Sequence, residues 1–152
     1  MQPRSIAPAM LVVFAGLVIA AWVSVGRLLF GVAGELTQLY TFSLGLFIFL
    51  LHAFIAEALL RAAQLGYRTR PATLAMLFAS WACGILLGLM IPDVTPLGLQ
   101  TILTGAIEPG LGIAIGVANP LAVIMVVTGI VALVLARGDA KGKAHAVQAE
   151  ED

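Results

Sequence analysis

The sequence has little charge and a single cysteine. Only 11% of its 152 residues are Asp, Glu, Lys or Arg, and its formal net charge is zero. Soluble domains carry about 25% charged residues. Without an excess of positive charge there is no electrostatic attraction for nucleic acid, so we expect no nucleic-acid partner. Because Cys83 has no second cysteine to pair with, an internal disulfide and any mechanism that needs a cysteine pair are excluded.

The chain also lacks the short sequence motifs that are typical of several enzyme classes. It contains no H-E-x-x-H, P-loop or G-x-S-x-G sequence and no cluster of metal ligands. We therefore expect no cofactor, no metal and no catalysis. An integral membrane enzyme is the third hypothesis in order, because it would need a cluster of polar side chains that the sequence does not assemble.

What the chain has is apolar surface. Hydrophobic residues make up 61% of it, and its mean hydropathy is +1.07. Runs of about 18 or more apolar residues predict membrane helices. The sequence therefore predicts an all-α bundle of four transmembrane helices in a single domain, with the bilayer as its solvent and a disordered, polar cytoplasmic tail at 137–152. The predicted spans are 8–25, 39–60, 71–91 and 120–136.

The first run could be mistaken for a signal peptide, since a short basic stretch precedes it. At 8–25 it is longer than the 7–15 apolar residues of a typical signal peptide, and no convincing A-x-A-like cleavage site follows. We expect it to be a retained span.

The basic residues predict the orientation. Under a four-span topology, one side of the membrane holds seven of the eight Lys and Arg residues, and the other side holds only Arg27. Cytoplasmic loops carry the excess of Lys and Arg, so both termini are expected in the cytoplasm of a bacterial plasma membrane. The seven are Arg4, Arg61, Arg68, Arg70, Arg137, Lys141 and Lys143.

The segment 97–118 is apolar but punctuated by proline. Thr95-Pro96 looks like a helix start, and Pro109 disfavours helical backbone at Glu108. A helix of about 12 residues, roughly 18 Å long, is too short to cross. We expect a short outer helix that breaks at Glu108, then a glycine-rich return that lies at the interface or re-enters the membrane, with Pro120 starting the last span. A fifth span is the alternative.

Three polar residues are candidate functional groups because intramembrane ionisable residues are costly. His52 lies in the middle of the second span, either as a neutral imidazole bonded to a neighbouring helix or as a proton relay or ligand contact. Glu57 lies four residues before Arg61, the favourable order for an ion pair, and could instead be a coupling carboxylate. Glu108 is either solvated at the interface or faces a cavity at a re-entrant turn.

Rows of small residues at four-residue spacing predict close helix packing in lipid. We expect the first and third helices to approach through these rows, either within one chain or against another subunit. The rows are Gly16, Ala20 and Ser24 in the first span and Ser80, Gly84 and Gly88 in the third.

Together these features favour a non-catalytic structural or accessory subunit of a membrane complex or homo-oligomer. Its partners would be lipid and another membrane protein or a second copy of itself. The alternative is a small transporter or channel that uses His52, Glu57 or Glu108, and it is favoured if these side chains line one cavity.

Overall fold

A computed structural model describes residues 6–142, so the expectations about Arg4, Lys143 and the tail beyond Gly142 lie outside the described residues. The described chain is mostly helical. It contains four helices that are long and apolar enough to cross a membrane: Ala7–Phe30, Leu36–Leu65, Pro71–Met90 and Gly110–Asp139. This confirms the helical character and the four candidate membrane helices that the apolar runs predict.

The four candidate spans comprise several shorter elements. A 3₁₀ turn extends the first, and a π-helical turn interrupts the second. In chain order the elements are α1 (Ala7–Val25), η1 (Gly26–Phe30), α2 (Leu36–Tyr40), η2 (Thr41–Gly45), α3 (Leu46–Leu65), α4 (Pro71–Met90), β1 (Asp93–Thr95), β2 (Gly98–Gln100) and α5 (Gly110–Asp139).

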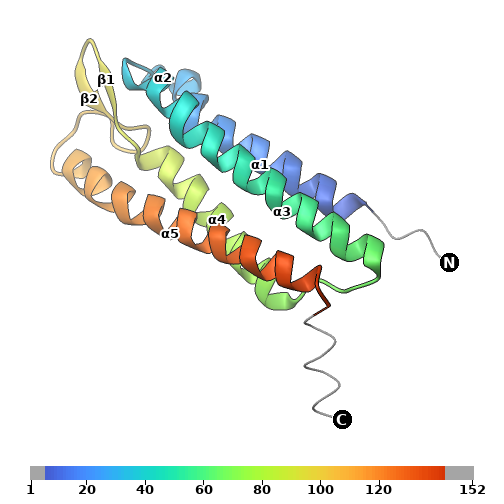
Figure 1. Ribbon diagram of the computed structural model, residues 1–152. Helices are drawn as coiled ribbons and strands as arrows, with labels where there is room; N and C mark the ends of the chain where they lie inside the picture. The colour runs from blue at the N-terminus through green and yellow to red at the C-terminus, as the bar shows by residue number, and fades with distance from the viewer. Residues whose placement is uncertain (1–5, 143–152) are drawn as a thin grey trace.

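The helices form a bundle in which α1 lies beside α3 and α4 beside α5, while α3 also contacts α5 (Figure 1). The β-hairpin and α2 lie at one end of the bundle, and α1 begins and α5 ends at the opposite end (Figure 1). Two apolar clusters fill the interior. One centres on Ile55, Leu77 and Ala132, and the other on Val23 and Leu87.

Proline and glycine mark several helix boundaries. Pro71 is the first residue of α4, where a missing N–H costs little. Gly66 ends α3 with a φ of 92°, a left-handed conformation that favours glycine. The Gly66 and Tyr67 amides donate to the Ala63 and Ala62 carbonyls of the last turn of α3. These local signals explain why the turn between α3 and α4 is short.

The expected short outer helix after Thr95-Pro96 is wrong, because a β-hairpin occupies its beginning. Strands β1 and β2 pair antiparallel, with Val94 opposite Leu99. Pro96 and Gly98 take the second and fourth positions of the connecting turn, as they do in type I turns. The Thr95 hydroxyl accepts from the Leu97 amide and donates to the Gly98 carbonyl, at 3.2 and 2.9 Å. The same residues that suggest a helix start therefore close a turn.

The expectation that Pro120 starts the last span is also wrong, because α5 begins at Gly110 and contains Pro120. Leu111, Ala114 and Ala118 recur at helical spacing and are buried. Their contact with the bundle favours helix through a glycine-rich segment. Pro120 removes one backbone donor, and membrane helices tolerate this. Residues 110–118 thus belong to α5 and form neither a glycine-rich return nor part of a separate fifth span, and α5 also extends three residues beyond the expected boundary at 136.

Candidate functional site

His52 is buried in α3, and both of its ring nitrogens are hydrogen-bonded. Nδ1 lies 2.7 Å from the Ile48 carbonyl and must donate, while Nε2 accepts from the Trp81 indole N–H at 3.0 Å. These two bonds select the neutral imidazole with its proton on Nδ1. Because the Nε2 lone pair is used by Trp81, His52 has no free position for a metal, and no group of three metal-ligating side chains occurs in residues 6–142.

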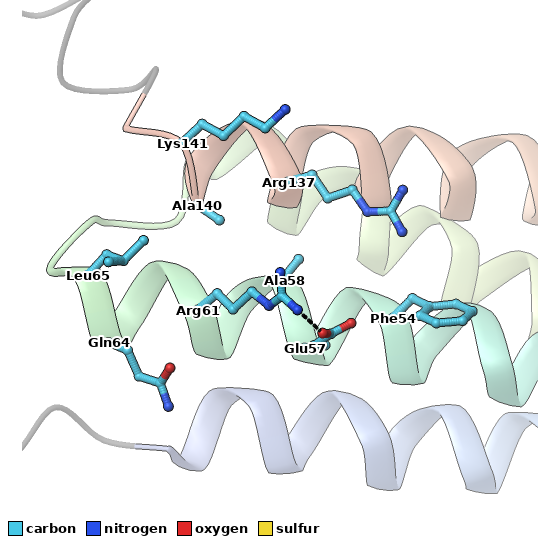
Figure 2. A pocket seen from close by; sticks show the side chains of 9 residues that line it. All are labelled: Phe54, Glu57, Ala58, Arg61, Gln64, Leu65, Arg137, Ala140 and Lys141. Carbon is cyan, nitrogen blue, oxygen red and sulfur yellow. Dashed lines mark hydrogen bonds and ion pairs between the residues drawn. The ribbon is translucent and has the colours of Figure 1, made fainter.

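Glu57 forms an ion pair with Arg61 one turn further along α3, and both side chains are largely exposed. The pair borders a cavity of about 410 Å³ between α3 and the last turns of α5. Figure 2 shows Arg61 and Arg137 on these two facing helices, with the Glu57–Arg61 bond between Phe54 and the helix ends.

Glu108 lies at the opposite end of the bundle, in the loop just before α5. Its carboxylate accepts a hydrogen bond from the Gly112 amide at 3.2 Å. Gly112 belongs to the first turn of α5, where backbone N–H groups lack helical acceptors. Glu108 therefore serves the start of α5 rather than the end of a preceding helix.

The three polar candidates are not brought together. His52 is enclosed at mid-bundle by Trp81, Glu57 is exposed near the end of α3, and Glu108 lies in the loop at the hairpin end. A shared transport cavity would need all three on one surface. Their separate surroundings remove the geometric support for a path through these residues.

The glycines of the small-residue rows lie at the contacts of α1 with α3 and of α1 with α4. A Cβ at Gly16 would overlap His52 of α3, while one at Gly88 would overlap Trp22 of α1. One at Gly84 would come within 2.7 Å of Ile19 in α1. The expected close approach of the first and third helices thus holds at Gly84 and Gly88, but Gly16 packs against the second span. The remaining members, Ala20, Ser24 and Ser80, are also buried.

The two serine hydroxyls of these rows each donate a hydrogen bond to a backbone carbonyl. Ser80 donates to Met125 of α5 at 2.9 Å, and Ser24 donates to Ala20 within α1 at 2.6 Å. Each buried hydroxyl therefore has an acceptor, and neither one is left for a ligand.

A buried ion pair at the hairpin end was not anticipated from the sequence. Arg27 and Asp93 are both fully buried, with Nη1 and Oδ2 3.6 Å apart. The guanidinium also donates to the Pro92 and Ser24 carbonyls and lies 4.5 Å from the centre of the Tyr40 ring. The nearest sequence signal is that Asp93 is one of four charged residues in the two segments 26–38 and 92–119, which also contain Arg27, Glu35 and Glu108.

Asp93 lies in β1, outside the helices, and accepts hydrogen bonds from the segments around it. Its carboxylate accepts from the Thr37 hydroxyl at 2.7 Å and from the Leu36 and Val94 amides at 2.8 Å each. Burial alone would raise the pKa of the Asp93 carboxyl. The hydrogen bonds from Thr37 and from the Gly34, Leu36 and Val94 amides outweigh burial and hold this pKa below its ordinary value.

A second carboxylate, Asp139, clamps the other end of the bundle. It is buried, pairs with Arg70 and accepts from the Thr73 hydroxyl at 2.7 Å. Arg70 also donates to the Leu135 carbonyl at 3.0 Å, so the start of α4 is tied to the end of α5. Assigning Asp139 to a disordered tail was therefore wrong, because helix α5 includes it.

The four long apolar helices suggest a multi-pass membrane protein. One end of the bundle is held by the fully buried Arg27–Asp93 pair, and the other by the pair of Arg70 with the buried Asp139. No protein-family model, curated protein or solved structure matches this chain.

Proposed function

We propose that the protein is a non-catalytic integral membrane subunit that packs through α5 against the helix of another membrane protein or of a second copy. One observation carries the proposal, namely that α5 is the least covered of the four candidate spans. Only 22% of its most apolar window is buried, against 33–44% in the other three.

The exposed face of α5 has the composition of a helix contact in lipid. Gly112, Gly116 and Asn119 are exposed on it, followed by Val123 and Val127. A Cβ at Gly116 would meet nothing within 4 Å, so another backbone can approach closely there. Small residues at this spacing and polar amides that bond across helices are typical of membrane interfaces.

The Asn119 side chain makes this face costly to leave in lipid. Within residues 6–142 it has no hydrogen-bond partner. It lies about 27 Å along α5 from Arg137 at 1.5 Å per residue, within the ~30 Å thickness of the hydrocarbon core if Arg137 marks one boundary. A neighbouring helix that supplies an acceptor or donor would remove that cost.

We predict that Gly116→Leu and Asn119→Leu each weaken this association. Interhelical hydrogen bonds in membranes contribute about 0.6–2 kcal/mol, so Asn119→Leu should lower association by roughly three- to thirty-fold. The Gly116→Leu side chain enters open space in the isolated chain, so its melting temperature should stay unchanged. Native mass spectrometry of the gently solubilised full-length protein measures what stays bound.

The matched control is Val18→Leu, which adds bulk to an exposed position of α1. It should leave the assembly intact. A shifted mass that equals two chains identifies a second copy as the partner, and a different bound mass identifies another subunit. The proposal is refuted if the wild type is a bare monomer, or if neither α5 variant alters its assembly.

We further propose that the protein resides in a bacterial plasma membrane with both termini in the cytoplasm. Among the described basic residues, Arg61, Arg68, Arg70, Arg137 and Lys141 lie at or next to the ends of α3, α4 and α5 that are remote from the hairpin. The remaining one, Arg27, is neutralised by Asp93 beside the hairpin. This asymmetry supports a cytoplasmic position for the basic end.

Single cysteines introduced into a Cys83→Ala background test this orientation. We predict that Leu97→Cys, at the exposed tip of the hairpin, reacts with a membrane-impermeant thiol reagent on intact cells. Gln64→Cys, exposed at the basic end, should react only after permeabilisation. The reverse pattern would invert the proposed orientation.

The transporter alternative is not proposed further, because no observation favours it. His52 is committed to two hydrogen bonds, Glu57 is in an exposed ion pair with Arg61 on α3, and Glu108 lies in the loop before α5.

A further inference from the structure

The cavity between α3 and α5 combines a cationic rim with an apolar wall. Arg61, Arg137 and Lys141 line it together with a single carboxylate, Glu57. Phe54 and Ala58 form the wall on α3. The cavity has a volume of about 410 Å³, and its lining residues lie on α3 and at the end of α5 (Figure 2).

The charges around this cavity are not balanced within residues 6–142. Glu57 is already bonded to Arg61. Arg137 and Lys141 have no ion-pair or hydrogen-bond partner for their side chains in residues 6–142. Among the described residues, the rim therefore keeps two unneutralised positive charges, which attract an anionic group.

The cations and the apolar wall follow one another along the axis of α3, which favours binding of an amphiphile over binding of a soluble anion. Phe54 lies about 10 Å deeper along α3 than Arg61, at 1.5 Å per residue. A group bound to the cations would therefore continue over an aromatic and alanine surface toward the hydrocarbon core. Basic pockets between transmembrane helices are known binding places for anionic lipid headgroups.

A second groove of similar size provides an internal comparison. It lies between α1 and α3, has a volume of about 500 Å³, and is lined by apolar residues such as Phe14 and Leu17. Glu57 is the only charged residue that lines it, and no cation does. The apolar lining of that groove can pack against lipid acyl chains, whereas the α3–α5 cavity also has cationic side chains that can bind a phosphate.

We propose that the α3–α5 cavity binds one anionic phospholipid, with its phosphate held by Arg137, Lys141 and Arg61 and an acyl chain lying against Phe54. This binding does not depend on the partner proposed for α5, because the exposed α5 face at Gly116 and Asn119 lies several helical turns from Arg137. If lipid binding is refuted, the association through α5 can still be tested, and the reverse also holds.

The experiment uses full-length protein in nanodiscs that contain equal phosphatidylglycerol and phosphatidylcholine with matched chains. Native mass spectrometry after release counts the lipids retained. We expect phosphatidylglycerol to be retained preferentially, and Arg137→Gln and Lys141→Gln each to lower its occupancy by about five-fold, equivalent to ~1 kcal/mol per surface cation. Both side chains are exposed, so the melting temperature should not change.

Arg68→Gln is the matched control, because it removes the same charge from an exposed position at the same end of the bundle, outside the cavity. It should leave retention unchanged. Equal losses in all three variants would mean general attraction to a basic surface and would overturn the site. Equal retention of the two lipids would also overturn it, as would displacement of phosphatidylglycerol by inorganic phosphate at millimolar concentration, which would indicate a soluble anion.

Discussion

Asp93→Ala lowers the free energy of unfolding by about 3–5 kcal/mol, the usual result of removing one partner from a buried ion pair. Arg27 would stay fully buried with its charge uncompensated. Thr37 and the Leu36 and Val94 amides would lose their common acceptor at the same time. Thermal melting of the purified protein in detergent measures the loss, which we expect to be among the largest of any single substitution.

Glu57→Ala is the control for this prediction, since it breaks an ion pair whose two side chains are exposed. Exposed pairs contribute about 0–1 kcal/mol, so its melting temperature should stay near that of the wild type. Asp93→Asn should fall between the two, because the amide oxygen still accepts hydrogen bonds. Equal melting temperatures for Asp93→Ala and Glu57→Ala would contradict the expected stabilisation by the buried Arg27–Asp93 pair.

The lowered pKa of Asp93 also predicts that the stability of the protein falls at acidic pH. Because the folded protein holds the pKa of Asp93 below the ordinary value of 3.8, its stabilisation is fully present above that value and is lost as pH falls through the folded pKa. Melting temperatures of the wild type should therefore drop below about pH 4, and part of that drop should be absent in Asp93→Asn.

Gly84→Leu is the second substitution with a large expected effect, because α4 is in contact with two helices at this residue. A Cβ there lies 2.7 Å from the Ile19 methyl of α1 and 3.2 Å from the Met125 sulfur of α5. Forcing extra methylenes into a packed core costs about 1–3 kcal/mol or more. We expect a clearly lower melting temperature in detergent.

Gly116→Leu makes the same chemical change where a Cβ meets nothing, so it controls for the helix propensity and hydrophobicity of leucine. Its monomer should melt like the wild type. If Gly84→Leu melted no lower than Gly116→Leu, the contact of α4 with α1 and α5 at this glycine would not stabilise the bundle.

Several sequence expectations failed because a local signal has two structural uses. Thr-Pro can cap a helix or begin a β-turn, and Gly98 at the end of the turn decides between them by adopting a φ of 99°. Pro120 can start a helix or lie within one. The burial of Ala114 and Ala118 against the bundle decides that case, and a helical periodicity of small apolar residues was the signal that could have shown it.

The polar residues show the same limit at longer range. A buried carboxylate near the hairpin needs a positive partner, and within residues 6–142 Arg27 is the only basic residue available there. The sequence nevertheless points to Glu108 as easily as to Asp93. For His52 the sequence leaves open a neutral imidazole bonded to a neighbouring helix and a proton relay. Only the bond from Trp81, 29 residues away in α4, favours the first.

The sequence by itself determined the number of candidate membrane helices, the end of the bundle that carries the basic residues, and the Glu57–Arg61 pair. Each of these depends on the length of an apolar run or on residues four apart, and so on chemistry within one helix. Only the tertiary structure decided that Arg27 meets Asp93, that Arg70 meets Asp139, and that Gly16 faces His52. Those contacts join residues from 36 to 69 positions apart, and their pairing depends on how the helices pack together rather than on any local preference.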